Sequence, residues 1–222
     1  MTLLRSENNG AIIKWVYNII MILKKYKTLF VHIDKTGGTS VENALRVYAE
    51  DNRVHPKPLR DKHLYIKEMM TPYTAGFFKF SFVRNPWDRF VSFYFWQRAK
   101  YLRSNPHPSF RSQVDYYYRY YKDKEQYLSH KKRAPHSHLV PQIWWLRDDK
   151  GKVAADFIGR FENLQGDFNI ICDRMGVERV DLPHVNKSKH NPYTEYYTDE
   201  SRETIGEIFA EDIQHFGYKF GE

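Results

Sequence analysis

The sequence predicts an α/β fold, a single domain with a central parallel sheet flanked by helices. The length of 222 residues suits one domain. A strand, a turn and a helix follow one another twice, over residues 28–48 and 78–103. Polar residues occupy both turns, and ligand sites of parallel sheets lie at the carboxyl ends of the strands. These observations place a candidate binding site at the two turns.

The composition excludes several classes of protein. Hydrophobic residues make up 41% and charged residues 28% of the chain, which is typical of a globular protein and excludes a disordered or fibrous one. Cys172 is the single cysteine, so a disulfide framework and a multi-cysteine metal cluster are excluded. Lys and Arg exceed Asp and Glu by 35 − 27 = 8. This excess favours an anionic partner, such as a nucleic acid, an acidic membrane surface, or an anionic cofactor or substrate.

An N-terminal helical segment is expected over residues 1–27, before a domain at 28–222. Residues 11–23 form an apolar run with one lysine and one asparagine. The run is shorter than the roughly 20 apolar residues of a membrane-spanning helix, and no cleavage site of a signal peptide follows it. We favour a helix that packs on the domain. The alternative is an interfacial helix that brings residues 11–27 into peripheral contact with a membrane.

The first turn carries the strongest chemical signal. A buried strand at residues 28–33, TLFVHI, runs into DKTGGTS at residues 34–40. Two adjacent glycines let a ligand approach the backbone, and the following helix adds its N–H groups and the positive end of its dipole. The side chains add one ammonium and three hydroxyls. The predicted phosphate-binding residues of this turn are Lys35, Thr36, Gly37, Gly38, Thr39 and Ser40.

Two other interpretations of this turn can be weighed. A tight turn with a capping box between Thr39 and Glu42 accounts for the glycines and marks the helix start, but it does not account for Lys35. The loop of nucleoside triphosphatases has its lysine directly before the Ser or Thr at the helix start. Here the lysine precedes the glycines, so the site is P-loop-like without being that loop.

The second turn offers an arginine and a serine. Arg84 follows the strand at residues 78–83, and Asn85 and Pro86 are a typical cap and first residue of the next helix. A guanidinium in this place can bind a phosphate with two hydrogen bonds. Ser92, two turns into the helix, can add a hydroxyl. Arg84 alone is equally consistent with a structural ion pair to Asp88.

The remaining elements follow from hydrophobic periodicity. Helices are predicted at residues 110–128, 137–147 and 162–175, with a strand at 156–161 and a last helix at about 198–213. The stretch YYYRYY at 116–121 is interpreted as a packed helix face rather than a surface for stacking sugars.

Taken together, the turns resemble a known family. The stretches are FVHIDKTGGTS and FSFVRNPWDRFVSFY, supported by DFIGRFENLQGDF, LPHVNKSKHNPYTEYY and HFGYKF. They are similar to the sulfotransferases that use 3′-phosphoadenosine-5′-phosphosulfate (PAPS), above all to the carbohydrate enzymes related to heparan 2-O- and chondroitin 4-O-sulfotransferases in a compact bacterial form. The resemblance covers residues 28–220.

This resemblance implies a sulfotransferase fold and the cofactor PAPS. The sulfuryl transfer implied for the family requires no metal and releases adenosine 3′,5′-bisphosphate. In this family the first loop holds the 5′-phosphosulfate, which implies that role for Lys35 to Ser40. The family likewise implies a 3′-phosphate site at Arg84 and Ser92. A stretch that closes over the nucleotide matches Lys187 and Ser188. Lys35 is the cation expected at the bridging oxygen that leaves.

The acceptor proton requires a base, and a histidine is the usual choice. His63 in DKHLYIKEM resembles the family's histidine beside the acceptor, so we assign it that catalytic role. His32, expected as a buried core residue, and His184 are alternatives. If the base is a carboxylate, Asp61 and Glu68 are the nearby candidates.

The expected function is therefore sulfuryl transfer to a glycan or glycolipid hydroxyl. The rival from another class is a basic module that binds a polyanion or nucleic acid without catalysis. The basic residues of this chain are dispersed along the sequence, and no nucleic-acid-binding motif is present, so we expect no nucleic-acid partner. A nucleotide kinase, which would need magnesium, is disfavoured by the first loop. We expect a bacterial cytoplasmic protein, with membrane association open, and the sequence does not indicate an oligomeric state.

Overall fold

Strands β2 (Thr28–Val31) and β3 (Phe78–Val83) pair in parallel at the centre of a four-stranded sheet. Thr28 lies opposite Phe78 and Val31 opposite Ser81. The sheet order is β1–β2–β3–β4, in which β1 (Ile22–Leu23) runs antiparallel to β2 and β4 (Phe157–Arg160) forms the other edge. This computed structural model describes residues 22–48, 64–101, 108–123, 139–183 and 190–222. The predicted α/β fold is confirmed.

The chain contacts divide into two compact units. The first comprises Met1–Ile33, Gly37–Phe82 and Trp145–Val185, and the second Asp34–Thr36, Val83–Trp144 and Asn186–Glu222. The chain therefore passes from one unit to the other and back within the first predicted phosphate loop. Each unit has a hydrophobic core of its own.

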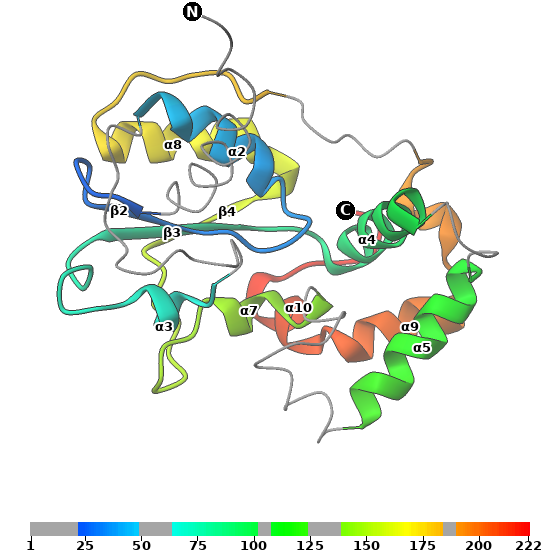
Figure 1. The fold of residues 1–222 in the computed structure, drawn as a ribbon. Coiled ribbons are helices and arrows are strands. Elements are labelled where there is room, and N and C mark those ends of the chain that lie inside the picture. Colours follow the sequence, from blue (N-terminus) through cyan, green and yellow to red (C-terminus); the bar gives the residue numbers. More distant parts are fainter. Residues whose placement is uncertain (1–21, 49–63, 102–107, 124–138, 184–189) are drawn as a thin grey trace, which may run out of the picture. The chain divides into compact units, whose positions relative to one another are not determined.

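The first unit contains the sheet. Helices α2 (Gly38–Leu45) and α8 (Leu164–Met175) cover one of its faces, and the short α3 (Ile66–Met69) lies on the opposite side (Figure 1). All four residues of β2 and five of the six residues of β3 are buried, as in parallel strands covered on both faces. Short 3₁₀ turns follow α2 at Arg46–Tyr48 and precede α8 at Phe161–Asn163. The core side chains of this unit include Phe30, Val41, Leu45, Phe80, Phe82, Phe168 and Ile171.

Helices build the second unit. Helix α9 (Asp199–Ile208) packs against both α4 (Pro86–Tyr101) and α5 (Phe110–Lys122), as Figure 1 shows. The other helical segments are α7 (Gln142–Trp145), a 3₁₀ turn at Tyr193–Tyr196, and α10 (Ala210–Phe216). Aromatic rings dominate the core that these helices share. The members include Trp87, Phe90, Phe93, Tyr117, Ile205 and Phe209.

Several predicted elements are confirmed and others need correction. The strand at 156–161 and the helix at 162–175 are present, and Gly176 ends α8 in a left-handed conformation. The predicted helix at 198–213 is instead two helices, α9 and α10, which meet at Phe209. Of the helices expected at 110–128 and 137–147, the described residues contain α5 and the four-residue α7.

The prediction of an N-terminal helical segment is wrong for the last residues of that segment, 22–27. Ile22 and Leu23 form strand β1, and the chain then turns into β2, so residues 22–27 belong to the sheet hairpin. Residues 1–21 lie outside the part of the chain that the structure describes, so the helix expected at 11–21 stays a prediction.

The tyrosine-rich stretch on α5 packs as expected. Tyr117 and Tyr120 are buried, and burial raises the pKa of Tyr117. Tyr118 donates its hydroxyl to the Glu207 carboxylate over 2.9 Å, and Tyr116 is the exposed member, at 41%. The stretch therefore packs against two helices, with Tyr117 on Phe90 and Phe93 of α4 and Tyr118 on α9.

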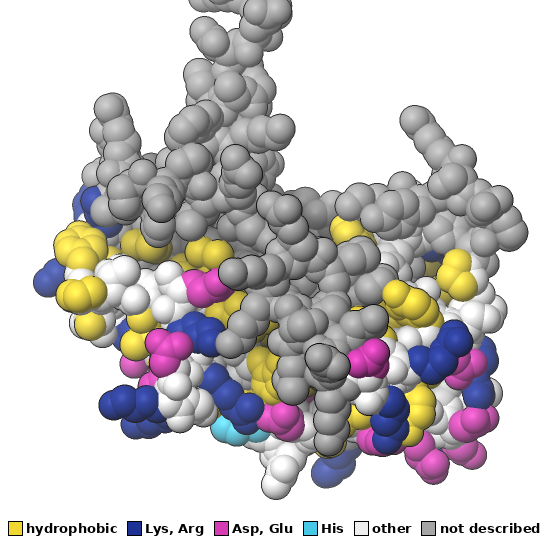
Figure 2. Space-filling model, turned by 60° about the horizontal axis from the view of Figure 1, so that its bottom comes forward, with side chains coloured by type: hydrophobic (Ala, Val, Ile, Leu, Met, Phe, Trp, Pro, Cys, Tyr) yellow, Lys and Arg dark blue, Asp and Glu magenta, His cyan; other side chains and the backbone are white. Residues whose placement is uncertain are grey.

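The described surface carries charges of both signs. On the face in Figure 2, Lys and Arg side chains alternate with Asp and Glu, and the side chains coloured there form no continuous basic patch. Over the residues that the structure describes, none of the helices has the length and apolar character needed to cross a bilayer.

Candidate functional site

The first loop enters α2 through a left-handed glycine. Gly37 is the N-cap, with φ of 82°, and its carbonyl accepts hydrogen bonds from the N–H groups of Ser40 (2.9 Å) and Val41 (3.3 Å). The N–H groups of Gly38 and Thr39 precede these first intrahelical bonds, which leaves them at the positive end of the helix dipole. The loop therefore has the backbone of an anion site.

Both glycines are required by the packing around them. A Cβ on Gly37 would lie 2.7 Å from Leu164 Cδ2, at a φ that side-chain-bearing residues rarely adopt. A Cβ on Gly38 would lie 2.1 Å from His32 Cδ2 and 2.2 Å from its Nε2. Protein side chains, those of Leu164 and His32, therefore approach these two glycines closely. The approach of a ligand to the same backbone stays a prediction.

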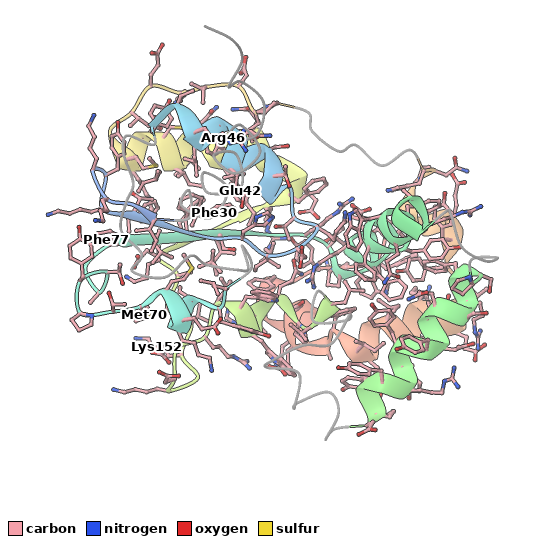
Figure 3. All side chains as sticks on the ribbon, viewed as in Figure 1. Phe30, Glu42, Arg46, Met70, Phe77 and Lys152 are labelled. Atoms are coloured by element: carbon pink, nitrogen blue, oxygen red, sulfur yellow. The ribbon has the colours of Figure 1, made fainter. Side chains whose placement is uncertain are left out.

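The predicted capping box is wrong. The N-cap of α2 is Gly37, with no side-chain hydrogen bond to the cap, and the Glu42 carboxylate instead binds His32. His32 Nδ1 lies 2.6 Å from Glu42 Oε1, and both side chains are buried. The imidazole stacks on Phe30 of β2. Figure 3 shows Phe30 below Glu42 of α2. His32 therefore supports the loop from the core, as its position in the sequence indicated.

Lys35 and the second turn meet within the second unit. Arg84 Nη1 donates to the Lys35 carbonyl oxygen over 3.2 Å. Arg84 also holds Asp88, with both Nε and Nη2 at 2.8 Å from Asp88 Oδ2. The ion pair weighed for Arg84 from the sequence is thus present, and the two turns that carry the motifs are joined by a hydrogen bond.

A second arginine, to which the sequence motifs assign no role, binds the same loop. Arg89 of α4 donates from Nε to the Asp34 carbonyl oxygen (3.0 Å) and from Nη1 to the Val140 carbonyl oxygen (3.0 Å). It is 1% exposed. The available sequence signal was its spacing, because Arg89 precedes Ser92 by three residues and helix positions three apart share a face.

That face of α4 is directed at the first loop. Arg89, Ser92 and Trp96 follow one another at spacings of three and four residues, so they project from the same side of the helix. The Lys35 ammonium lies 5.5 Å from the centroid of the Trp96 ring, a cation–π contact. Ser92 is buried and lies on this face between two residues that contact the loop. Its predicted role with Arg84 at a 3′-phosphate stays a prediction.

Buried polar residues fix the backbone of Arg84. The Gln142 side chain accepts from the Arg84 N–H and donates to the Arg84 carbonyl, both over 2.9 Å. Asp212 accepts hydrogen bonds from the N–H groups of Gln142 (2.7 Å) and Ile143 (2.9 Å). Burial raises the pKa of Asp212, and the nearby Arg89 and these donors oppose the rise. This network was not predicted, although Asp212 falls on the apolar stripe of its helix with Phe209 and Phe216.

Other predicted site residues are not described. His63, Lys187 and Ser188 lie outside the described residues, as do the alternative bases Asp61 and His184. The alternative Glu68 is used structurally, because its Oε2 accepts the Tyr65 N–H over 2.8 Å at the start of α3. Among the described side chains, no group of three His, Cys, Asp or Glu could hold a metal ion.

Comparison with known proteins agrees with the motifs. A model of the sulfotransferase family matches residues 18–219, which is most of the chain. The chain belongs to the sulfotransferase family. No protein with curated annotation matches this sulfotransferase. Among solved structures, mouse sulfotransferase SULT7A1 complexed with PAP is similar over 90% of each chain, with 14% identity and a TM-score of 0.48. The predicted enzyme class is thus confirmed.

Proposed function

We propose that this sulfotransferase transfers the sulfuryl group of PAPS to a hydroxyl of a carbohydrate, either a glycan or a glycolipid. PAPS would supply the activated sulfate and leave as adenosine 3′,5′-bisphosphate. The residues of the chain would bind the nucleotide, neutralise the charge that develops on the leaving oxygen, and remove the acceptor proton.

The hydrogen bond between Arg84 and the Lys35 carbonyl carries the proposal. It joins the residue proposed for the 3′-phosphate to the residue proposed for the 5′ side, which supports the proposal that the two motifs bind one ligand. Ser92, on the α4 face that contacts the loop, completes the 3′ side. Thr36, Gly37, Gly38, Thr39 and Ser40 would bind the 5′-phosphosulfate through N–H groups and hydroxyls.

Three residues outside the described part of the chain complete the assignment. We propose His63 as the base that accepts the proton of the acceptor hydroxyl, and Lys187 and Ser188 as further nucleotide contacts. The burial of the alternative base His32 supports the assignment of His63. His32 lies between Glu42 and Gly38, so it is poorly placed to reach an acceptor.

The nucleotide assignment is tested by thermal unfolding without added metal. Adenosine 3′,5′-bisphosphate at a hundredfold excess over its dissociation constant should stabilise the folded protein by about 2.7 kcal/mol. The control ligand is 5′-AMP, which lacks the 3′-phosphate. Equal shifts with both ligands would remove the role of Arg84 and Ser92. The acceptor is then sought by transfer from labelled PAPS into a panel of glycan and glycolipid extracts.

The salt dependence of ligand binding distinguishes the enzyme from the non-catalytic alternative, a polyanion-binding module. Binding through phosphate neutralisation weakens steeply as salt rises, whereas a nucleotide held by a buried arginine and by backbone N–H groups should be less sensitive. A bacterial cytoplasm, where activated sulfate is made, is the proposed location, and membrane contact through residues 11–27 is a further proposal.

A further inference from the structure

Lys35 has an unusual backbone conformation. Its φ is 68°, in the left-handed region that residues with a Cβ avoid. Lysine has no side chain that stabilises this conformation locally, in contrast to asparagine or aspartate. A strained residue of this kind persists only where its surroundings fix it.

Two arginines fix the peptide groups on either side of Lys35. The carbonyl of Asp34 belongs to the peptide before the Lys35 Cα, and Arg89 Nε donates to it over 3.0 Å. The carbonyl of Lys35 belongs to the peptide after it, and Arg84 Nη1 donates to it over 3.2 Å. Because φ and ψ of a residue are set by the orientations of its two flanking peptides, these hydrogen bonds together select the left-handed conformation.

Both arginines are themselves held in place. Arg89 also binds the Val140 carbonyl over 3.0 Å. The guanidinium of Arg84 binds the Asp88 carboxylate, and the backbone N–H of Arg84 binds the Gln142 side chain. Arg84 and Arg89 are 7% and 1% exposed, so neither can change its orientation without repacking. The support of Lys35 is therefore rigid.

This conformation directs the Lys35 ammonium along α4. The ammonium lies over Trp96, and Ser92 lies between Trp96 and Arg89 on the same helix face. A lysine with the usual negative φ would send its side chain from the loop in a different direction. The left-handed conformation thus determines which groups the ammonium can reach.

We propose that Arg89 is a positioning residue of the transfer reaction. It selects the left-handed conformation of Lys35 and so places the ammonium where charge develops on the leaving oxygen. The proposal rests on the proposed function, in which Lys35 has that role. Arg89 does not touch the substrate; it acts through the Asp34 carbonyl, so its effect on turnover depends on the presence of the Lys35 ammonium.

A double-mutant cycle tests this dependence. Arg89→Lys keeps the buried positive charge but lacks the planar fork that binds two carbonyls at once. It should lower kcat by about 10- to 100-fold, with a much smaller change in KM for PAPS. In a Lys35→Ala background the same change should lower kcat by less than about threefold. Equal losses in both backgrounds would overturn the proposal.

A control separates this effect from general destabilisation. Gln113→Ala removes another buried polar side chain of the second unit, in α5. It should lower the melting temperature and leave kcat unchanged at a temperature where the protein is folded. A loss of kcat in this variant as large as that in Arg89→Lys would also overturn the proposal.

A second measurement needs no activity, so it remains informative if the proposed function fails. Because only glycine adopts a positive φ without strain, Lys35→Gly should melt about 2–4 °C above Lys35→Ala. Glu203 is an exposed position within α9, and there the glycine variant should melt below the alanine variant. Equal melting temperatures of Lys35→Gly and Lys35→Ala would overturn the proposal even if Arg89→Lys does not fold. Loss of their difference in the Arg89→Lys background would identify Arg89 as the residue that imposes the conformation.

Discussion

Glu42 Oε1 lies 2.6 Å from His32 Nδ1, and the same imidazole fills the space beside Gly38. His32 follows β2 directly, whereas Glu42 and Gly38 belong to the second and first turns of α2. One side chain thus fixes the start of the helix in two ways, by binding a carboxylate and by packing on its first residue. The shape of the predicted phosphate loop therefore depends on a residue outside the loop.

We first predict that Gly38→Ala destabilises the protein by about 1–3 kcal/mol, because the new methyl group would displace the His32 ring. The measurement is the free energy of unfolding in urea. His32→Ala should remove most of this additional cost in the double variant, a non-additivity expected of residues in contact. The control is Gly206→Ala in α9, whose Cβ would make an ordinary 3.4 Å contact with Trp87. Additive effects of the two changes would contradict the packing described.

The features that sequence predicted correctly are those encoded by neighbouring residues. Asn85 and Pro86 start α4 as expected, with Asn85 Oδ1 accepting the Trp87 N–H over 3.2 Å. Gly176 ends α8. The adjacent glycines and Lys35 selected the first loop by local chemistry, and its role in phosphate binding stays a prediction.

The failures come from contacts between distant residues. The spacing of Thr39 and Glu42 fits a capping box, but His32, ten residues before Glu42, binds its carboxylate instead. Arg89 binds a carbonyl 55 residues away in the sequence. The spacing of Arg89 and Ser92 places both on one helix face, but a single sequence does not show that Arg89 binds the distant Asp34 carbonyl.

A second prediction concerns Trp96. Its ring holds the Lys35 ammonium through a cation–π contact, and we expect a bound phosphate to compete with the ring for the ammonium. A contact of this kind is worth about 0.5–1 kcal/mol at a partly exposed site, so Trp96→Leu should tighten the binding of adenosine 3′,5′-bisphosphate by about 2- to 5-fold. Calorimetric titration measures this, with Trp144→Leu as the matched control. A weaker affinity in Trp96→Leu would show that the ring contacts the nucleotide itself.

A third prediction concerns acid stability of the contact between α5 and α9. Arg111 binds Glu200 through two hydrogen bonds of 2.7 and 2.6 Å, and Lys122 binds Glu207. Hydrogen bonds from these cations lower the pKa of both carboxyls. A carboxyl whose pKa is lower in the folded state stabilises the protein above its unfolded pKa, and this stabilisation is lost as pH falls through the folded pKa.

A double variant, Glu200→Gln with Glu207→Gln, tests the contribution of these two carboxyls to stability in acid. The double variant should lose less stability than the unaltered protein between about pH 5 and pH 3, since it has no such carboxyls to protonate. Because the four side chains are largely exposed, the difference should be small and should shrink in high salt. Urea midpoints measured across this range give the comparison, with Glu203→Gln on the same helix as control. Parallel pH profiles for the double variant and the unaltered protein would rule out this contribution.

The last prediction separates nucleotide binding from chemistry. Lys35→Ala should both weaken the binding of adenosine 3′,5′-bisphosphate and slow transfer, because the ammonium faces the ground-state phosphate as well as the developing charge. His63→Ala should leave nucleotide affinity nearly unchanged and lower kcat by about 10²- to 10⁴-fold, the usual contribution of a general base. A histidine base is inactive when protonated, so the rate of the unaltered enzyme should fall at acidic pH, and His63→Ala should lack that fall. Turnover against pH for both variants, with affinity measured in parallel, decides the assignment. Normal turnover in His63→Ala would pass the role to His184 or a carboxylate, whereas a large loss of nucleotide affinity would place His63 in the nucleotide site.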